Sequence, residues 1–157
     1  MFFQGAAFVD NHPRPVYRGI VDFEIPLKKK ILIVEHSEAL GEALCDYLNE
    51  RDYETFWGRD GLEGYALFLK EQPDLVILDA LAPTLDGVAL CEKIKDTPFG
   101  RRTKVIVTGR VLRNRRERES EDRNLGADEI LAKPFRLEEL ESKIVVQLNG
   151  TEGRTFH

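Results

Sequence analysis

The chain has 157 residues, of which 42% are hydrophobic and 32% are charged, a balance typical of one soluble globular domain. Its formal net charge of −5 argues against nucleic-acid binding, and no apolar run approaches the roughly 20 residues that cross a bilayer. The two cysteines, Cys45 and Cys91, fall in separate helical patterns. We therefore predict a cytoplasmic protein with reduced thiols and without nucleic-acid or membrane partners.

Residues 1–27 form an N-terminal extension whose composition differs from the rest of the chain. Pro13 and Pro15 prevent a helix there, and residues 21–25 alternate apolar with acidic side chains in the period of a strand. The segment is predicted to be a docked arm or an extra strand. A disordered extension is the open alternative.

Between residues 28 and 149, short apolar runs alternate with amphipathic patterns. The predicted strands are residues 31–34, 53–57, 75–79, 104–108 and 129–132, and a helical pattern follows each of them. This strict alternation predicts an α/β domain with a parallel sheet, helices on both faces and right-handed crossovers. Ser37 is the predicted N-cap of the first helix. Residues 150–157 are expected to be a C-terminal tail.

The strand at residues 75–79 ends its apolar run on a carboxylate, Asp79. An unbroken apolar run of this length is typical of a strand buried on both faces, which can carry an ionisable group only where the backbone leaves the core. Ligands of open α/β sheets bind outside the carboxyl ends of the strands, so Asp79 is a site candidate. The competing interpretation is a residue that only caps a turn or the next helix.

The other strand ends place Glu35, His36, Thr108 and Lys133 on the same edge of the predicted sheet. This set is coherent for phosphoryl transfer. A carboxylate can accept a phosphoryl group, the other acids can hold a divalent cation, and the amine and hydroxyl can bind the phosphoryl oxygens. The convergence makes Asp79 a candidate phosphoacceptor.

In their order and spacing, these motifs resemble the receiver domain of two-component response regulators, in particular the chemotaxis-type single-domain receivers. The resemblance implies a flavodoxin-like, three-layer (βα)5 doubly wound sheet with strand order 2-1-3-4-5 across residues 28–149. The matching motifs are Ile31-Leu32-Ile33-Val34-Glu35, Asp60-Gly61, the loop with Asp79, Pro83 and Asp86-Gly87, Val107-Thr108-Gly109, Leu125-Gly126-Ala127-Asp128 and Lys133-Pro134-Phe135.

The resemblance also implies roles for the edge residues. Asp79 would take a phosphoryl group from a sensor histidine kinase or a phosphotransfer protein. Thr108 and Lys133 would bind the phosphoryl oxygens, and Thr108 and Ile130 occupy the switch positions. Lys133 is expected to precede Pro134 through a cis peptide bond.

The implied cofactor is Mg²⁺, with Glu35, Asp79 and the backbone carbonyl of Leu81 as ligands. His36 departs from this pattern, because the family usually has an acid there that ligates the ion directly. Mg²⁺ requires oxygen ligands, whereas imidazole suits Zn, Ni or Cu better, so His36 is expected to weaken Mg²⁺ binding. The alternative is that the remaining oxygens, with extra waters, still hold Mg²⁺.

Two further departures concern signal output. Ile130 stands where the family usually has Tyr or Phe, so no ring can turn inward with Thr108. The segment from Arg113 to Asn124 is a highly charged helical pattern. It is either a solvated, self-paired helix or a partner-docking face.

The sequence therefore predicts a phosphorylatable receiver without an enzymatic output domain. It would signal to a downstream protein through the face of the fourth helix, fifth strand and fifth helix, or as a homodimer through this face. The alternative is a pseudo-receiver that binds partners independently of phosphorylation. An aspartate-based phosphatase is disfavoured, because Leu81 stands where such enzymes need a second acid.

Overall fold

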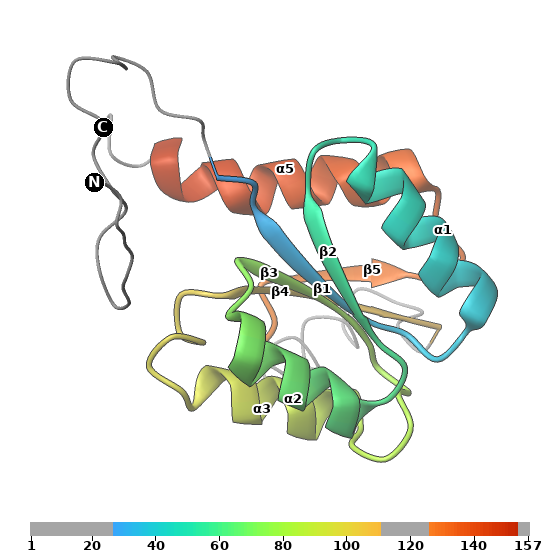
Figure 1. Cartoon of the computed structure of the whole chain (residues 1–157), viewed down its shortest axis with the longest axis vertical. Helices are drawn as coiled ribbons and strands as arrows, with labels where there is room; N and C mark the ends of the chain where they lie inside the picture. Colours follow the sequence, from blue (N-terminus) through green and yellow to red (C-terminus); the bar gives the residue numbers. More distant parts are fainter. Residues whose placement is uncertain (1–26, 111–125, 154–157) are drawn as a thin grey trace, which may run out of the picture.

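The computed structural model describes residues 27–110 and 126–153, which form one parallel sheet between two layers of helices (Figure 1). Five strands pair in the order β2-β1-β3-β4-β5, which confirms the predicted doubly wound architecture. The strands are β1 (Lys30–Val34), β2 (Glu54–Gly58), β3 (Leu75–Asp79), β4 (Lys104–Gly109) and β5 (Glu129–Ala132). The helices are α1 (Glu38–Asn49), α2 (Gly61–Glu71), α3 (Gly87–Lys95) and α5 (Leu137–Gly153).

Helices α1 and α5 cover one face of the sheet, and α2 and α3 cover the other (Figure 1). The predicted arm at residues 1–27 lies outside the described part except for Leu27, and the charged pattern at 113–124 lies outside it entirely. Helix α5 continues to Gly153, so its last turn falls within the segment 150–157 that we expected to be a tail. No helix of the described residues is long and apolar enough to cross a membrane.

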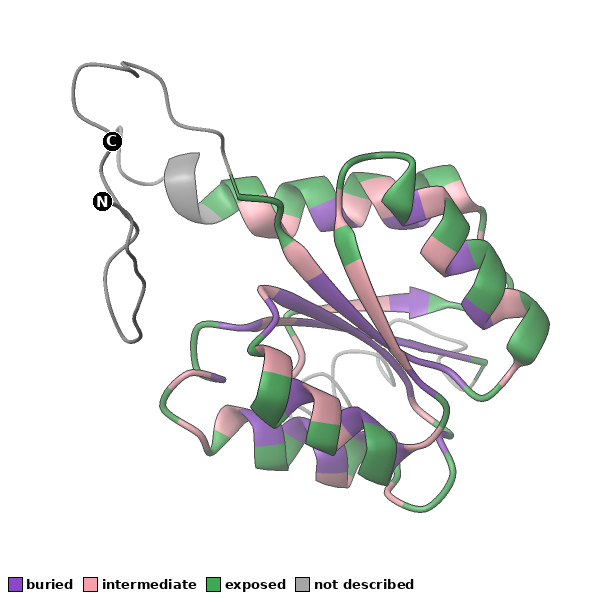
Figure 2. Cartoon of the chain, viewed as in Figure 1, coloured by how far each residue is buried: buried purple, intermediate pink, exposed green. Residues whose placement is uncertain are grey.

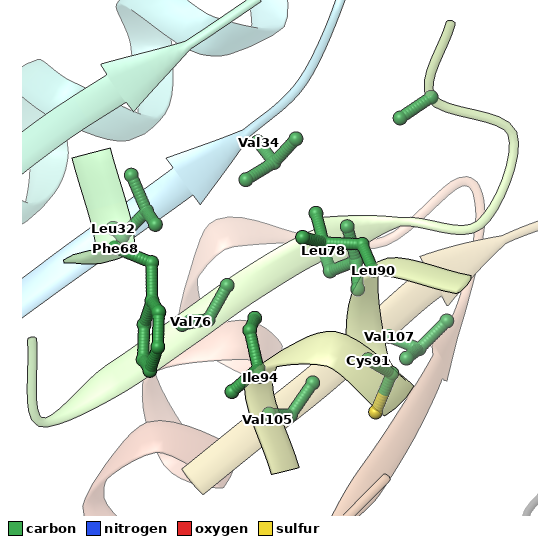
Figure 3. Packing of buried hydrophobic residues seen from close by; sticks show 11 residues of the cluster. Leu32, Val34, Phe68, Val76, Leu78, Leu90, Cys91, Ile94, Val105 and Val107 are labelled. Carbon is green, nitrogen blue, oxygen red and sulfur yellow. The ribbon is translucent and has the colours of Figure 1, made fainter. Parts of the chain in front are cut away.

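The central strand β3 is buried along its whole length, as its apolar run predicts (Figure 2). Its side chains alternate between the two faces, because successive residues of a strand point in opposite directions. Leu75 and Ile77 join the core beneath α1 and α5. Val76 and Leu78 join the core beneath α2 and α3, where they pack with Leu90 and other side chains (Figure 3). The sheet thus separates two apolar cores.

Three helices begin directly after a strand or its loop, each with a capping side chain. Ser37 accepts a hydrogen bond from the backbone N–H of Leu40 (3.3 Å), which confirms the predicted N-cap of α1. Asp60 and Asp86 cap α2 and α3 in the same way. These caps satisfy backbone donors that a helix start leaves unpaired, and they fix where each chain segment turns back from the sheet edge.

Gly41 on α1 allows the close approach of Trp57 at the end of β2. A Cβ atom at position 41 would lie 2.1 Å from Trp57 Cζ2, too close for any side chain. A Cβ atom at position 150 on α5 would meet no atom of the described residues within 4 Å, so Gly150 provides a matched helical control.

We predict that Gly41→Ala lowers the free energy of unfolding by about 1–3 kcal/mol, because the ring of Trp57 must move. Gly150→Ala should raise it by about 0.5–1 kcal/mol, since alanine is the better helix former. Urea unfolding followed by circular dichroism measures both. Equal midpoints for the two variants would contradict the packing described here.

Candidate functional site

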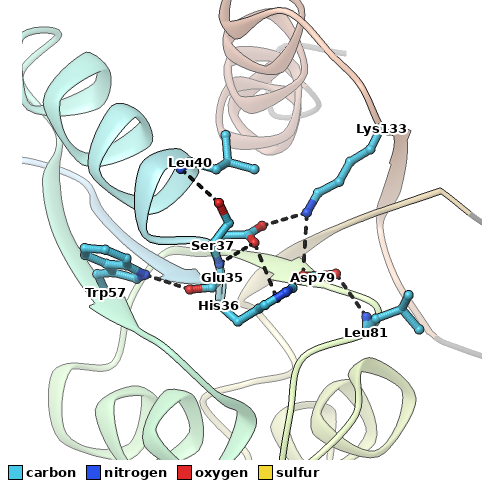
Figure 4. A network of polar contacts seen from close by, with 8 residues as sticks. All are labelled: Glu35, His36, Ser37, Leu40, Trp57, Asp79, Leu81 and Lys133. Carbon is cyan, nitrogen blue, oxygen red and sulfur yellow. Dashed lines mark hydrogen bonds and ion pairs between the residues drawn. The ribbon is translucent and has the colours of Figure 1, made fainter.

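The carboxyl edge of the sheet brings together four of the predicted site residues from three strands (Figure 4). Asp79 ends β3, Glu35 and His36 follow β1, and Lys133 follows β5. Backbone hydrogen bonds extend the strand pairing at this edge. The N–H of Glu35 donates to Gly58 (3.0 Å), and the N–H of Lys133 donates to the carbonyl of Gly109 (2.8 Å). The sheet backbone itself therefore positions these side chains.

Lys133 is the cation shared by two buried carboxylates. Its Nζ lies 2.8 Å from Glu35 Oε1 and 3.5 Å from Asp79 Oδ2. The carboxylates are only 3% and 4% exposed, and the lysine side chain is 18% exposed. At about 4 Å, a unit charge pair contributes on the order of 4 kcal/mol at an effective dielectric near 20, so the ammonium offsets much of the repulsion between the acids.

The two oxygens of Asp79 have different partners. Oδ1 accepts the backbone N–H of Leu81 (3.0 Å), which is a local turn of the kind that aspartate often forms. Oδ2 faces Lys133 and the Nδ1 atom of His36, which lies 3.0 Å away. Asp79 therefore stabilises a turn and also presents an oxygen to the edge residues, so it does more than cap a turn, and its role as a site residue stays a prediction.

His36 contacts both acids through one ring nitrogen. Nδ1 is 3.0 Å from Asp79 Oδ2 and 3.6 Å from Glu35 Oε2. The contact with Asp79 is a hydrogen bond when Nδ1 carries the proton, because a carboxylate only accepts. The imidazole is 53% exposed and is the solvent-facing member of the group. The sequence did not predict this direct contact with Asp79.

Trp57 anchors the backbone beside these residues. Its indole Nε1 donates to the carbonyl oxygen of Glu35 (2.9 Å; Figure 4). Its ring packs on Gly41. The guanidinium of Arg59 lies 4.4 Å from the ring centroid on the outside. The sequence gave no signal for the bond to Glu35, which requires β2 and β1 to be neighbours.

The loop that follows Asp79 is tied to the start of α2. The Thr84 hydroxyl donates to Asp60 Oδ1 (3.1 Å), and the N–H of Gly61 donates to the carbonyl of Pro83 (2.8 Å). A hydrogen bond from the backbone N–H of Glu63 holds the pKa of the Asp60 carboxyl below its usual value, and Thr84 adds to this effect. These contacts fix the Asp60-Gly61 motif against the loop that carries Leu81.

The two predicted switch residues lie on neighbouring strands but on opposite faces of the sheet. Thr108 is buried beside Asp79, its register partner on β3. Ile130 is paired with Val107, which belongs to the core beneath α2 and α3, and is only half-buried. The expected cis peptide bond between Lys133 and Pro134 is confirmed.

Glu35, His36 and Asp79 form a group that could hold a metal ion, since one donor atom from each lies within 4.8 Å of the others. The two carboxylates suit Mg²⁺, and the imidazole does not, because Mg²⁺ prefers oxygen ligands in octahedral geometry. The Leu81 side chain is exposed, and its N–H is used by Asp79. The roles of individual metal ligands, including the Leu81 carbonyl, stay predictions.

A doubly wound sheet with acids, an amine and a buried threonine at its carboxyl edge defines a receiver-type α/β protein. Residues 31–145 match the family described as the response regulator receiver domain. The chain belongs to this family, whose members act in two-component signalling.

Named relatives and solved structures agree with this assignment. A probable transcriptional regulator, ycf27 of Guillardia theta, is 33% identical over 140 residues, which cover 87% of this chain and 52% of the relative. The transcriptional regulatory protein RprY of Bacteroides fragilis is 31% identical over 131 residues, covering 81% and 52%. The chain therefore spans about half the length of the curated relatives it matches.

Among solved structures, the signal receiver domain of a signal transduction histidine kinase from Syntrophus aciditrophicus has a TM-score of 0.69 and 34% identity. The match covers 78% of this chain and 91% of that chain. A receiver domain protein from Methanospirillum hungatei has a TM-score of 0.71 and 28% identity, covering 81% and 98%.

We predict that Lys133→Met lowers the free energy of unfolding, because the buried acids lose their shared cation. In an Asp79→Asn background one negative charge is already gone, so the same substitution should cost at least about 1 kcal/mol less. A double-mutant cycle in urea measures this coupling.

Lys143 provides the matched control, since it pairs with Glu129 at 3.3 Å away from the site. Lys143→Met should cost the same in both backgrounds. Additive effects of Lys133→Met and Asp79→Asn would show that Lys133 does not balance the charge of Asp79.

Proposed function

We propose that this chain is a phospho-accepting receiver in which phosphorylation of Asp79 switches protein–protein contacts. The observation that carries the proposal is the buried Asp79 carboxylate, which lies 3.5 Å from the Lys133 ammonium at the carboxyl edge of the sheet. The donor would be the phosphohistidine of a sensor histidine kinase or a phosphotransfer protein. Membership of the receiver family supports this direction of transfer.

In the proposed step, a carboxylate oxygen of Asp79 attacks the phosphorus of the phosphohistidine. An O–P bond forms, the N–P bond breaks, and the electron pair returns to the imidazole of the donor. Lys133 would stabilise the negative charge on the phosphoryl oxygens, which is the main contribution a protein makes to such a transfer. Thr108, the register partner of Asp79, would donate its hydroxyl to the new phosphoryl group.

Ile130 and the face formed by β5 and α5 are the proposed output route, to a downstream protein or a second copy of the chain. Ile130 supports this route because it is only half-buried on the strand that precedes Lys133. A change in the position of Lys133 would then alter the conformation of β5, which directly precedes it. The proposed place of action is the cytoplasm, without nucleic acid or membrane as partner and without an enzymatic output of this domain.

A pseudo-receiver is the second candidate function, and His36 is the observation that favours it. The imidazole lies 3.0 Å from Asp79 and occupies the position of a family acid, so Asp79 already has partners without any added group. A domain of this kind would bind partners regardless of phosphorylation.

We predict that the purified chain gains one phosphoryl group when incubated with acetyl phosphate and a divalent cation. Intact-mass spectrometry measures the gain, and Asp79→Asn should abolish it, because an amide cannot act as the acceptor. Parallel reactions with Mg²⁺ and with Mn²⁺ are run so that the labelling result does not depend on the choice of a single ion.

Asp86→Asn is the matched control. Asp86 is exposed on the same edge, and its side chain caps α3 through the N–H of Ala89 (3.0 Å), a role that asparagine also fills. This variant should be labelled like the native chain. No labelling of the native chain under either ion would reject the phospho-accepting role and leave the pseudo-receiver.

A further inference from the structure

We propose that Glu35, His36 and Asp79 form a binding site for a borderline divalent transition ion of the Zn²⁺ type, in preference to Mg²⁺. The inference concerns the ion that this edge selects and does not require phosphorylation of Asp79. It rests on the donor atoms that the fold places together.

The spacing of the donor atoms fits one shared ion. His36 Nδ1 lies 3.0 Å from Asp79 Oδ2 and 3.6 Å from Glu35 Oε2. Ligands at about 2.1 Å from a common ion are about 3.0 Å apart in octahedral and about 3.4 Å apart in tetrahedral geometry. These two distances therefore suit donors that share a metal at bond length, the three donor atoms all lie within 4.8 Å of one another, and the choice among ions depends on the chemistry of the donors.

That chemistry includes one imidazole nitrogen and two carboxylate oxygens. Imidazole is a good ligand for Zn²⁺, Ni²⁺ and Cu²⁺, and a poor one for Mg²⁺, which keeps oxygen ligands and releases its waters reluctantly. A mixed set of histidine and carboxylate is common at zinc sites that keep a position open for water or substrate. His36 therefore shifts the preference of the edge toward the transition ion.

The formal charge of the site also favours a transition ion over Mg²⁺. Glu35 and Asp79 contribute two negative charges and Lys133 one positive charge, which leaves a formal charge of −1 around the donors. An acid at position 36 would make it −2. Mg²⁺ binding depends mainly on charge and hard oxygens, whereas a transition ion also gains from the nitrogen lone pair, so the lower charge disfavours Mg²⁺ more.

The imidazole can supply that lone pair without losing a proton. Neutral histidine carries one ring proton, and moving it from Nδ1 to Nε2 frees Nδ1 for the ion. The half-exposed ring leaves Nε2 free to bond to water and gives the ion a route from solvent. Each buried acid keeps the contact of its second oxygen, because Glu35 Oε1 faces Lys133 and Asp79 Oδ1 faces the N–H of Leu81. The donor oxygens themselves also face Lys133, at 3.5 Å from Asp79 Oδ2, and the N–H of Ser37, at 3.0 Å from Glu35 Oε2.

The competing interpretation is that His36 serves only as a hydrogen-bond donor to Asp79 and replaces the ion. Metal titrations of the full chain separate the two. The probes are Co²⁺, whose visible spectrum reports its ligands in place of Zn²⁺, and Mg²⁺. Binding is measured by isothermal titration calorimetry and by the fluorescence of Trp57, the only tryptophan, which is bonded to the Glu35 carbonyl.

For His36→Ala we expect Co²⁺ affinity to fall by about tenfold or more while Mg²⁺ affinity changes by less than about threefold. For His36→Asp we expect Mg²⁺ affinity to rise, and the preference for Co²⁺ over Mg²⁺ to fall by about tenfold or more. The Co²⁺ visible bands should shift in both variants, because the nitrogen ligand is lost. His36 is half-exposed, so both variants should fold, and urea unfolding checks this.

The chain has three histidines, and a double variant of the other two, His12→Gln with His157→Gln, is the matched control. It should keep the Co²⁺ affinity and spectrum of the native chain. Equal losses of Co²⁺ and Mg²⁺ in His36→Ala, no loss of Co²⁺, or loss of Co²⁺ in the control would each overturn the proposal. Because no phosphoryl donor is present, these outcomes are separate from the labelling of Asp79.

Discussion

One ammonium group between two buried carboxylates constrains the whole carboxyl edge of this sheet. The acids come from the adjacent strands β1 and β3, whereas Lys133 follows β5, and β4 lies between β3 and β5. The lysine must therefore reach over a strand to meet Asp79, a span of about 10 Å between strand axes. Only a long side chain can do this. The strand order, the register and the length of this side chain therefore depend on one another.

Much of this arrangement was predictable because it is encoded locally. A buried strand needs an unbroken apolar run, and such a run can carry an acid only where it leaves the core, which placed Asp79 correctly. The cap at Ser37 and the alternation of elements follow from residue types at short spacing. The strand order itself came from resemblance to a family, since the apolar period does not say which strands are neighbours.

The contacts that the sequence did not predict depend on segments brought together by the fold. His36 meets Asp79 across 43 positions of the chain, and the Trp57 indole reaches Glu35 only because β2 lies beside β1. Both contacts depend on the direction in which the side chains point, and no local sequence pattern determines that direction. The end of α5 at Gly153 was also missed, because residues 150–153 have no apolar periodicity to mark them as helical.

The alternation of β3 side chains has a consequence for how this protein can evolve. Leu75 and Ile77 pack on one side of the sheet, and Val76 and Leu78 pack on the other, so in the described part of the chain a single layer of backbone separates the two apolar cores. A larger side chain in one core is accommodated by the helices of that core, because the hydrogen-bonded strands resist displacement. One helical layer can therefore change its sequence to suit a new partner while the sheet backbone keeps the edge residues in place.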